Sequence, residues 1–356
     1  MPKLSYLKAL NRALGDEMEA DPAVFVLGED VRAGLTGTTA GLVDRFGPQR
    51  VLETPISEQG FTGFATGAAM AGLRPVVEYQ NPSTLILAFE QIANQSNKFS
   101  ATSGGQFTVP VTYLLPNSGV RAAWGAHHSG ASYSMFAHVG VKTVLPATPA
   151  DAYGLFRTAI RDDDPVLVCA PYQALQVRDD LVFADLVPVP LGVGRIHREG
   201  HDVTVVALGH LVHDAIAVAD QLAGEVSIEV FDPRTLWPFD WDGLAASVNK
   251  TGRLVVLDDA SRFAGISGEI AATAAEEMQL TEPPVRITQP DGVVLGLAPE
   301  LDRVFQPNQE QLVAAVRQLA GRTPNGTTPN GMTPDGVARA RAEASTRARA
   351  EASIGK

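Results

Sequence analysis

The sequence predicts an α/β protein with two domains, each built on a parallel-type sheet flanked by helices. Short apolar segments alternate with segments whose apolar residues recur at helical spacing, which is typical of parallel sheets covered by helices on both faces. At 356 residues, the chain exceeds what one hydrophobic core usually organises, so two domains are expected. Hydrophobic residues make up 45% and charged residues 19%, as in ordinary globular proteins.

The N-terminal half opens with an amphipathic helix. Tyr6, Leu10, Leu14 and Met18 are spaced for one helix face, and Pro22 ends the pattern. The next strands are expected at residues 23–27, 76–79, 109–115, 141–145 and 166–169, and the next helices at 60–72, 85–99 and 150–161. This alternation indicates the first parallel sheet.

The C-terminal half repeats the alternation after a charged, irregular connection at about residues 173–199. Strands are expected at 203–208, 227–231 and 253–257, and helices at 212–222, 241–248 and 268–278. Asn308 is the expected N-cap of a last helix that runs to Leu319. The predicted domains are therefore residues 1–190 and 191–321.

Residues 322–356 differ in kind from the rest of the chain. TPNG occurs at 323–326 and 328–331, TPDG at 333–336, and ARAEAS at 340–345 and 348–353. Pro and Gly at this density do not hold a helix, and the segment has too few large apolar residues for a core. The sequence predicts a disordered tail.

Composition argues against several classes of partner. The formal net charge of −12 is unfavourable for nucleic acid as the main partner. No run of about eighteen apolar residues exists, so no membrane span is expected. The N-terminus lacks the pattern of a signal peptide, and the single cysteine, Cys169, excludes an internal disulfide framework. We therefore expect a cytoplasmic protein.

The most informative stretch is ETPISEQGFTGFATGAAMAGLRPVVEYQ, residues 53–80. Glu58 lies in a polar turn before the expected helix. That segment contains four glycines, Gly60, Gly63, Gly67 and Gly72. Because each glycine inside a helix costs about 1 kcal/mol against alanine, another backbone or a ligand is expected to approach closely. On position alone, a helix-capping role is favoured for Glu58, since a carboxylate there satisfies free amides and the helix dipole.

Several long segments, in order, resemble the β subunits of thiamine-diphosphate-dependent pyruvate and branched-chain 2-oxo acid dehydrogenases. TPISEQGFTGFATGAAMAGLRPVVE matches them nearly residue for residue, and the likeness covers Ser5–Leu319. It includes SGGQFTVPV (103–111), HHSGASYSMFAH (127–138), AIRDDDPVL (159–167) and DPRTLWPFDWDGLAASVNKTGRLVVLDDA (232–260). The resemblance implies a transketolase-like pyrimidine-binding domain followed by a transketolase C-terminal domain.

The resemblance implies two catalytic residues, Glu58 and His128. A carboxylic acid at Glu58 would hydrogen-bond to the aminopyrimidine of thiamine diphosphate and favour the tautomer that removes a proton from the thiazolium carbon. His128, followed by Ser129, would orient the bound intermediate and move a proton during acyl transfer to a lipoyl group. His127 is interpreted as a neighbour of the site and His138 as a residue of the fold.

The same resemblance implies the ligands of a cofactor and of an ion. The cofactor-binding residues would be Glu29, Glu58, Gln80 and Thr84. Glu29 follows a strand end, where α/β proteins collect ligand-binding residues, although a solvated loop carboxylate is an equal alternative. A potassium ion is implied at the AIRDDDPVL turn, where three aspartates are also typical of a solvated turn. Its ligands, mostly backbone oxygens, would be Val111, Ala159, Ile160, Asp162 and Asp164.

Two features depart from the family pattern, both near the expected substrate pocket. Thr84 stands where family members usually carry Phe or Tyr, and the loss of a stacking ring would weaken the cofactor pocket by about 1 kcal/mol. Either Tyr79 compensates, or the substrate pocket has been remodelled. Gly130, Ala131 and Tyr133 replace larger or charged residues that commonly follow the His-Ser pair. The sequence does not name the oxo acid.

An α subunit is the expected partner. The sequence has no GDG-plus-asparagine element for magnesium and diphosphate, and no GxxxxGK[ST] loop. The chain alone should therefore bind thiamine diphosphate poorly. The α subunit would hold Mg²⁺, most simply in an α₂β₂ heterotetramer with cofactors at the α–β interfaces.

Three functions are compatible with these observations. The first is the β subunit of a 2-oxo acid dehydrogenase, with a small 2-oxo acid as substrate and a lipoyl-bearing acyltransferase as acyl acceptor. The second is a carboligase or decarboxylase subunit of specialised metabolism that transfers an acyl or two-carbon unit to another acceptor, which the Thr84 region favours. The third is a non-catalytic scaffold, against which the retention of Glu58 and His128 counts.

Overall fold

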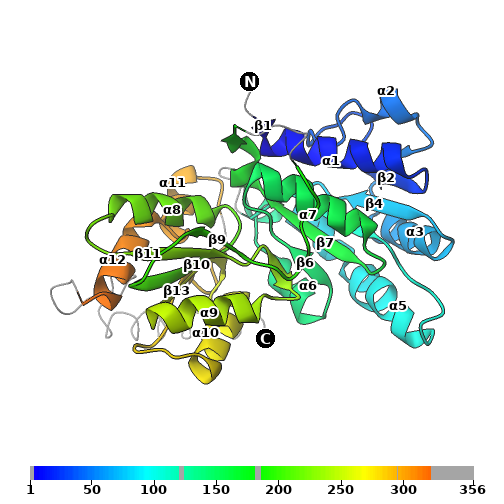
Figure 1. Cartoon of the computed structure of the whole chain (residues 1–356). Coiled ribbons are helices and arrows are strands. Elements are labelled where there is room, and N and C mark those ends of the chain that lie inside the picture. Colours follow the sequence, from blue (N-terminus) through cyan, green and yellow to red (C-terminus); the bar gives the residue numbers. More distant parts are fainter. Residues whose placement is uncertain (1–3, 120–123, 181–185, 295, 322–356) are drawn as a thin grey trace, which may run out of the picture.

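The computed structural model of the chain describes residues 4–119, 124–180, 186–294 and 296–321 (Figure 1). The predicted tail, residues 322–356, lies outside the described part. Two α/β halves lie side by side, each around its own sheet, which confirms the predicted fold class. None of the described helices combines the length and the hydrophobicity that a membrane-spanning helix needs.

The first half is built on a seven-stranded sheet in the order β12-β6-β7-β5-β4-β2-β3. Its strands are β2 (Val24–Gly28), β3 (Val51–Glu53), β4 (Arg74–Glu78), β5 (Thr112–Ser118), β6 (Lys142–Val144), β7 (Val166–Pro171) and β12 (Thr235–Trp237). All neighbouring pairs are parallel except β12 and β6. The parallel order aligns the carboxyl ends of β2, β4 and β5 at one edge, where α/β proteins bind ligands.

Helices cover both faces of this sheet. On one face, α1 (Tyr6–Ala20) packs against α7 (Pro149–Arg161). The Ser5 side chain caps α1, and the predicted apolar stripe of α1 is buried. On the other face lie α3 (Glu58–Met70), α4 (Pro82–Leu87), a π-helical turn (Gln91–Ser96), α5 (Asn97–Thr102) and α6 (Tyr133–His138). The sheet is therefore buried on both sides.

The single helix expected at residues 85–99 is wrong, because the chain forms α4, the π-helical turn and α5 there. The wide turn places the Ser96 hydroxyl in the core, hydrogen-bonded to the hydroxyls of Tyr113 and Thr66. A buried hydroxyl needs such partners, and a regular helix would point this side chain elsewhere.

The second half is built on a five-stranded sheet in the order β14-β13-β10-β11-β9. Its strands are β9 (Arg195–Arg198), β10 (Val203–Ala207), β11 (Ile228–Asp232), β13 (Leu254–Ser261) and β14 (Val285–Gln289), and only β9 runs antiparallel to its neighbour. The helices are α8 (Leu211–Gln221), α9 (Trp241–Thr251), α10 (Ile266–Glu277) and α12 (Gln309–Leu319). Asn308 caps α12, as predicted.

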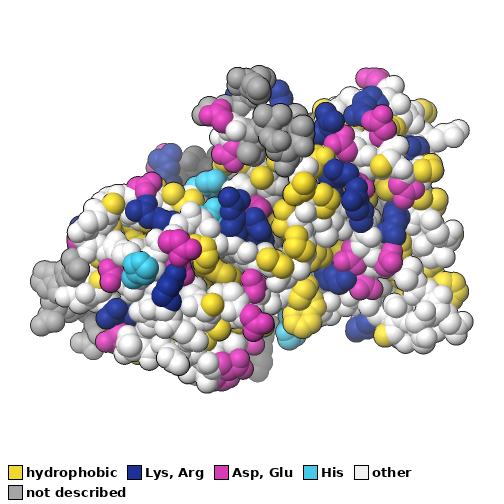
Figure 2. Space-filling model, viewed as in Figure 1, with side chains coloured by type: hydrophobic (Ala, Val, Ile, Leu, Met, Phe, Trp, Pro, Cys, Tyr) yellow, Lys and Arg dark blue, Asp and Glu magenta, His cyan; other side chains and the backbone are white. Residues whose placement is uncertain are grey.

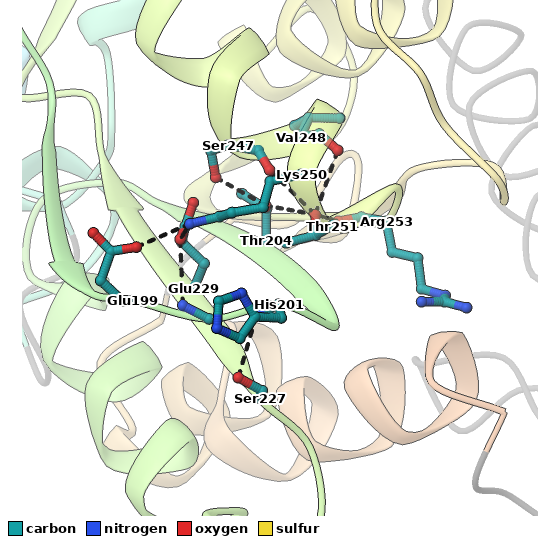
Figure 3. Close-up of polar contacts among 11 residues, drawn as sticks. Glu199, His201, Thr204, Ser227, Glu229, Ser247, Val248, Lys250, Thr251 and Arg253 are labelled. Atoms are coloured by element: carbon teal, nitrogen blue, oxygen red, sulfur yellow. Dashed lines mark hydrogen bonds and ion pairs between the residues drawn. The ribbon is translucent and has the colours of Figure 1, made fainter.

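Polar side chains fix α9 to this sheet (Figure 3). The Thr204 hydroxyl on β10 lies 2.9 Å from the Ser247 hydroxyl and 2.8 Å from the Thr251 hydroxyl, both on α9. Lys250 of α9 donates to the buried Glu229 carboxylate on β11. Because these buried groups have partners, the cluster braces the helix against the sheet.

A strand of the second half completes the sheet of the first. β12 follows β11 in the chain, yet it pairs antiparallel with β6, with Thr235 opposite Val144 and Trp237 opposite Thr143. One apolar core cluster also contains residues of both halves. Figure 2 shows hydrophobic side chains gathered near this boundary on the visible face. The sequence did not predict β12, β3, β9 or β14, nor the short elements β1 (Leu4–Ser5), β8 (Arg178–Asp179), α2 (Leu42–Phe46) and α11 (Pro299–Phe305).

Candidate cofactor and catalytic site

The carboxyl edge of the first sheet brings two of the predicted cofactor residues together. Gln80 follows β4, and its side-chain amide donates to the backbone carbonyl of Glu29, just after β2, at 2.6 Å. Asn117, near the end of β5, donates from its side chain to the carbonyl of Gln80 at 2.9 Å. Three neighbouring strands therefore fix the backbone around Glu29.

Glu58, the first residue of α3, lies beside this edge. Its side chain is 7% exposed, and its negative charge acts on the carboxyl of Glu29. Ser57, at the N-cap, makes no side-chain capping bond, and no described residue donates a hydrogen bond to the Glu58 carboxylate. The Glu58 side chain therefore makes no capping hydrogen bond among the described residues, although its place in the first turn of α3 suits the helix dipole. The carboxylate keeps its acceptor oxygens free beside Glu29.

Glu29 is an electrostatically unfavourable carboxylate. Burial raises its pKa, and the negative charges of Glu58, Asp30 and Glu53 raise it further. Its Oε1 atom is buried without a hydrogen-bond partner among the described residues. An unpaired buried oxygen costs free energy that a hydrogen-bond donor would recover. The pair Glu29 and Glu58 thus fits an aminopyrimidine ring, which offers N–H donors and a basic nitrogen.

Glu78 is a residue of this region that the sequence analysis missed. It lies on β4, 1% exposed, and accepts hydrogen bonds from the hydroxyls of Thr36 and Thr38 in the segment after Glu29. Burial raises the pKa of Glu78 to about 7, although the Thr38 and Thr36 hydrogen bonds lower it. Its place in VVEYQ was the available signal, since a charged residue at the end of an apolar strand needs partners.

The Thr84 side chain caps the start of α4. Its hydroxyl donates to the Asn81 carbonyl at 2.8 Å and accepts from the Asn81 amide, while Asn81 caps the Thr84 amide in return. Tyr79 is 1% exposed, packs on Phe61, and shares a hydrogen bond with the Thr62 hydroxyl. Tyr79 is thus a core residue, so its position favours a remodelled pocket over compensation by this ring.

His128 ends a 3₁₀ turn, Ala126–His128, that contacts α4. Its side chain is partly exposed, and its ring centroid lies 5.8 Å from that of Trp124. α4 also contacts α3, which begins at Glu58. One helix thus connects the segments of the two predicted catalytic residues. His127 is exposed, and so is His138, at the end of α6.

The turn expected to bind potassium is crossed by cationic side chains. Arg74 donates to the carbonyls of Ile160 and Asp162 at 3.3 and 3.0 Å. Lys142 forms ion pairs with the carboxylates of Asp162 and Asp164 at 2.8 and 2.9 Å. The Val111 and Ala159 carbonyls accept backbone hydrogen bonds. These hydrogen bonds and ion pairs involve much of the set of oxygen atoms that was expected to bind potassium. The potassium site stays a prediction.

A separate cavity of about 720 Å³ opens between the halves, away from Glu58. Its lining includes the aromatic residues Trp237, Trp241 and Phe263 and the polar residues Arg286 and His138. None of the residues assigned to the cofactor or to catalysis lines it. This cavity is therefore distinct from the candidate site.

Another cluster has some features of a metal site but already contains a cationic partner. Ligand atoms of Asp151, His197 and Asp232 lie within 4.8 Å of one another at the boundary of the halves. Arg234 pairs with Asp151 at 2.6 Å, and His197 lies 3.2 Å from the Asp232 carboxylate. A guanidinium beside the cluster would repel a metal cation. The group is consistent with an ion-pair brace.

Comparison with known proteins defines first the class. Residues 2–178 match the pyrimidine-binding domain of transketolase, and residues 192–312 match the transketolase C-terminal domain. A solved structure described as a split gene transketolase, inactive beta4 tetramer, has a TM-score of 0.74 at 22% identity, covering 91% of this chain and 100% of that one. At this identity the structural likeness shows the fold. The chain is thus of the transketolase type.

Sequence relatives then define the family. The chain is 36% identical to 2-oxoisovalerate dehydrogenase subunit beta of Bacillus subtilis, with 90% of this chain and 99% of that protein covered. It is 38% identical to mitochondrial pyruvate dehydrogenase E1 component subunit beta-2 of Oryza sativa subsp. japonica (89% and 86% covered). It is 37% identical to acetoin:2,6-dichlorophenolindophenol oxidoreductase subunit beta of Bacillus subtilis (89% and 97% covered). The chain belongs to the family of 2-oxo acid dehydrogenase E1 β-like subunits.

Proposed function

We propose that this chain is the β subunit of a thiamine-diphosphate-dependent 2-oxo acid dehydrogenase that decarboxylates a small 2-oxo acid and transfers the acyl group to a lipoyl group. Enzymes of this family use thiamine diphosphate, and their β subunits pair with α subunits. The observation that carries the proposal is the placement of two carboxyls at the carboxyl edge of a parallel sheet. Glu58 is 7% exposed, and the partly exposed Glu29 has a buried Oε1 atom without a hydrogen-bond partner among the described residues.

Glu58 and Glu29 would hold the aminopyrimidine end of the cofactor. When bound, the cofactor supplies the electron sink for decarboxylation. Glu58 would hold a proton at the pyrimidine ring nitrogen, and its low exposure limits competing water. Glu29 would accept a hydrogen bond at its unpaired Oε1. Gln80 fixes the Glu29 backbone and so would orient Glu29. These roles need no diphosphate-binding element on this chain.

His128 would act later, during acyl transfer. It reaches the site from the 3₁₀ turn beside α4, and its partial exposure leaves it accessible to an incoming acyl acceptor. An imidazole can give and take a proton near neutral pH, which suits transfer to a thiol. We propose Thr84 as part of the substrate pocket, since its side chain caps α4 and leaves the place of an aromatic ring open.

An α subunit completes the site in this proposal. It would supply the magnesium and diphosphate ligands that the sequence lacks, in an α₂β₂ heterotetramer. We also propose that the complex works in the cytoplasm, consistent with a single buried cysteine. The carboligase alternative stays open because one relative is an acetoin oxidoreductase subunit and because Thr84 departs from the usual aromatic.

The test is reconstitution of this chain with its α subunit. We expect the complex, but neither chain alone, to release CO₂ from a 2-oxo acid when thiamine diphosphate and Mg²⁺ are present. Glu58→Gln should assemble normally by size-exclusion chromatography and lose nearly all turnover. Glu90→Gln, an exposed carboxyl on the same half, is the matched control. Robust decarboxylation by the isolated chain, or by the Glu58→Gln complex, would contradict the proposal.

A further inference from the structure

Three titratable side chains that the proposed function does not use meet between the two halves. Tyr133 is the first residue of α6, and Asp258 and Asp259 lie near the end of β13. The Tyr133 hydroxyl lies 2.5 Å from Asp258 Oδ1 and 2.6 Å from Asp259 Oδ1. All three side chains are at most 4% exposed. The contact therefore joins α6 of the first half to the sheet of the second.

The hydrogen count of this contact requires one additional proton. A tyrosine hydroxyl carries a single hydrogen, whereas both neighbouring oxygens are carboxylate acceptors when ionised. Two ionised carboxylates sharing that hydrogen would leave two like charges buried side by side. One proton on either aspartate removes the repulsion, since the protonated carboxyl can donate to the Tyr133 oxygen. The hydrogen bonds of the cluster are thus satisfied when it contains one carboxylate, one carboxylic acid and one hydroxyl.

The two aspartates differ in their hydrogen-bond partners. Asp258 accepts additional hydrogen bonds from the backbone amides of Ala260 and Ser267, which stabilise its ionised form. No amide of another described residue is bonded to the Asp259 side chain. Burial raises the pKa of each aspartate to about 6, against a lowering by the Tyr133 hydrogen bond. The charge of Asp259 raises the pKa of Asp258, and the backbone amide of Asp259 lowers the pKa of its own carboxyl, so either aspartate can hold the shared proton.

The cluster is connected to His128 through the backbone. Gly119 follows β5, and a Cβ atom placed on it would lie 2.6 Å from Asp259 Oδ2, so the carboxyl is packed against this glycine. Gly119 and Gly130 exchange two backbone hydrogen bonds, at 3.0 and 2.9 Å. Gly130 comes two residues after His128 and three before Tyr133. The Asp259 carboxyl thus contacts the segment that carries His128 in two ways: through Gly119, which pairs with Gly130, and directly at Tyr133.

We propose that Tyr133 is a positioning residue for His128, held by a proton that Asp258 and Asp259 share. The inference rests on the catalytic role proposed for His128. The contact fixes the segment 128–133 against the second half, and its alignment is kept while the shared proton is present. Loss of that proton places two charges around the Tyr133 hydroxyl and releases the segment.

Few other titratable groups face this cluster. Cys169 of β7 interacts electrostatically with Asp259, and burial raises the pKa of its thiol to about 12, so it stays neutral. Ser118 bonds to Cys169, and Ser267 lies at Asp258, and neither titrates. Among the described groups of this cluster, the change in charge between pH 4 and pH 8 therefore comes from the two aspartates.

Melting temperature against pH tests the shared proton in the full chain assembled with its α subunit. The native pair holds its proton up to about pH 6, whereas ordinary aspartates lose theirs near 3.8, so stability falls as pH rises across this window. Asp259→Asn keeps a donor at all pH values and removes this loss. We expect the melting temperature of the variant, relative to that of the wild type, to rise from pH 4 to 6. Above pH 6 the difference between the two melting temperatures should stay constant. A constant difference throughout would overturn the shared proton.

Acyl transfer to lipoamide tests the positioning role, with decarboxylation measured in parallel by an artificial electron acceptor. Tyr133→Phe should slow acyl transfer by about ten- to hundredfold, with decarboxylation within about twofold, since misplacement of a catalytic group has effects of this size. In the wild type, the rate of acyl transfer should fall above about pH 6, where the shared proton is lost. Asp259→Asn should abolish this fall. Tyr153→Phe is the control, because its hydroxyl also bonds an aspartate, Asp16, on the far face.

The outcomes separate this inference from the proposed function. Equal transfer rates in Tyr133→Phe and Tyr153→Phe, or an unchanged pH profile in Asp259→Asn, would overturn the positioning role while decarboxylation upholds the β-subunit function. If no complex, wild type included, decarboxylates any 2-oxo acid, the proposed function fails. The melting profiles then still decide for or against the shared proton.

Discussion

Thr84, which we propose as part of the substrate pocket, is hydrogen-bonded to the backbone at the start of α4. Its hydroxyl completes a reciprocal cap with Asn81 at the start of α4, and the same helix contacts the turn that carries His128. An aromatic residue at this position could not complete the cap. The departure from the family pattern therefore changes the local hydrogen bonding.

Thr84→Phe tests whether the space beside Thr84 belongs to the substrate. We expect the preferred oxo acid to lose about ten- to hundredfold in kcat/KM, because overfilling a packed site costs about 1–3 kcal/mol. Affinity for thiamine diphosphate should not change. Thr84→Val, which removes the hydroxyl without adding a ring, separates loss of the cap from loss of space. Tighter cofactor binding with unchanged substrate preference would refute a remodelled pocket.

Glu78 predicts a pH dependence of stability. Its folded-state pKa of about 7 lies above the ordinary value of 4.5, so the native state binds this proton more tightly and stability falls as pH rises between the two values. Glu78→Gln keeps the Thr36 and Thr38 partners but does not ionise. The variant should gain on the wild type from pH 4.5 to 7, reaching about 3 kcal/mol at pH 8. Urea unfolding at several pH values measures the free energy of unfolding of both proteins. Parallel plots of this free energy against pH would contradict the prediction.

The candidate site was partly predictable from single residues. Glu29, Glu58 and Gln80 were expected near the cofactor, and the structure places them around one sheet edge, although their roles stay predictions. Glu78 was missed because its importance depends on two threonines that are distant in sequence. The Tyr133 contact was beyond reach for the same reason, since its partners lie 125 and 126 residues further along the chain.

At the scale of elements, the long periodic segments were predictable and the short ones were not. α1 and α7 carry strong apolar stripes with clear caps, and their positions agree with expectation within a few residues. β12 has three residues, which is too few for any periodicity to be read. The break between α4 and α5 depends on buried hydroxyl partners, so it is set by tertiary contacts and not by local propensity.

The brace between α9 and the second sheet gives an element-scale prediction. Lys250 joins the buried Glu229 carboxylate and the exposed Glu199 carboxylate (Figure 3). Lys250→Met should destabilise the chain by about 3 kcal/mol, because it leaves the buried carboxylate without its cationic partner. Glu199→Gln should change little, since an exposed ion pair contributes little. Denaturant unfolding measures both, and equal effects would show that the burial of Glu229 does not decide the outcome.

At the scale of the whole molecule, the body and the tail should be separable. A chain that ends at Gly321 keeps every described helix and strand, including α12. We expect it to assemble with the α subunit and to retain turnover within about twofold, because the Pro/Gly-rich repeats cannot pack a core. Size-exclusion chromatography and CO₂ release measure these properties. An inactive or insoluble truncation would show that the tail binds the body or its partner.

The position of β12 has a consequence for how the chain is made. During translation, β7 leaves the ribosome at Pro171, but the strand that closes the β6 edge ends at Trp237, 237 − 171 = 66 residues later. At 5–20 residues per second, that edge stays open for roughly 3–13 s on the nascent chain. An unpaired sheet edge readily pairs with other chains. Fast synthesis through residues 172–237, or a chaperone held there, would therefore limit aggregation of the nascent chain.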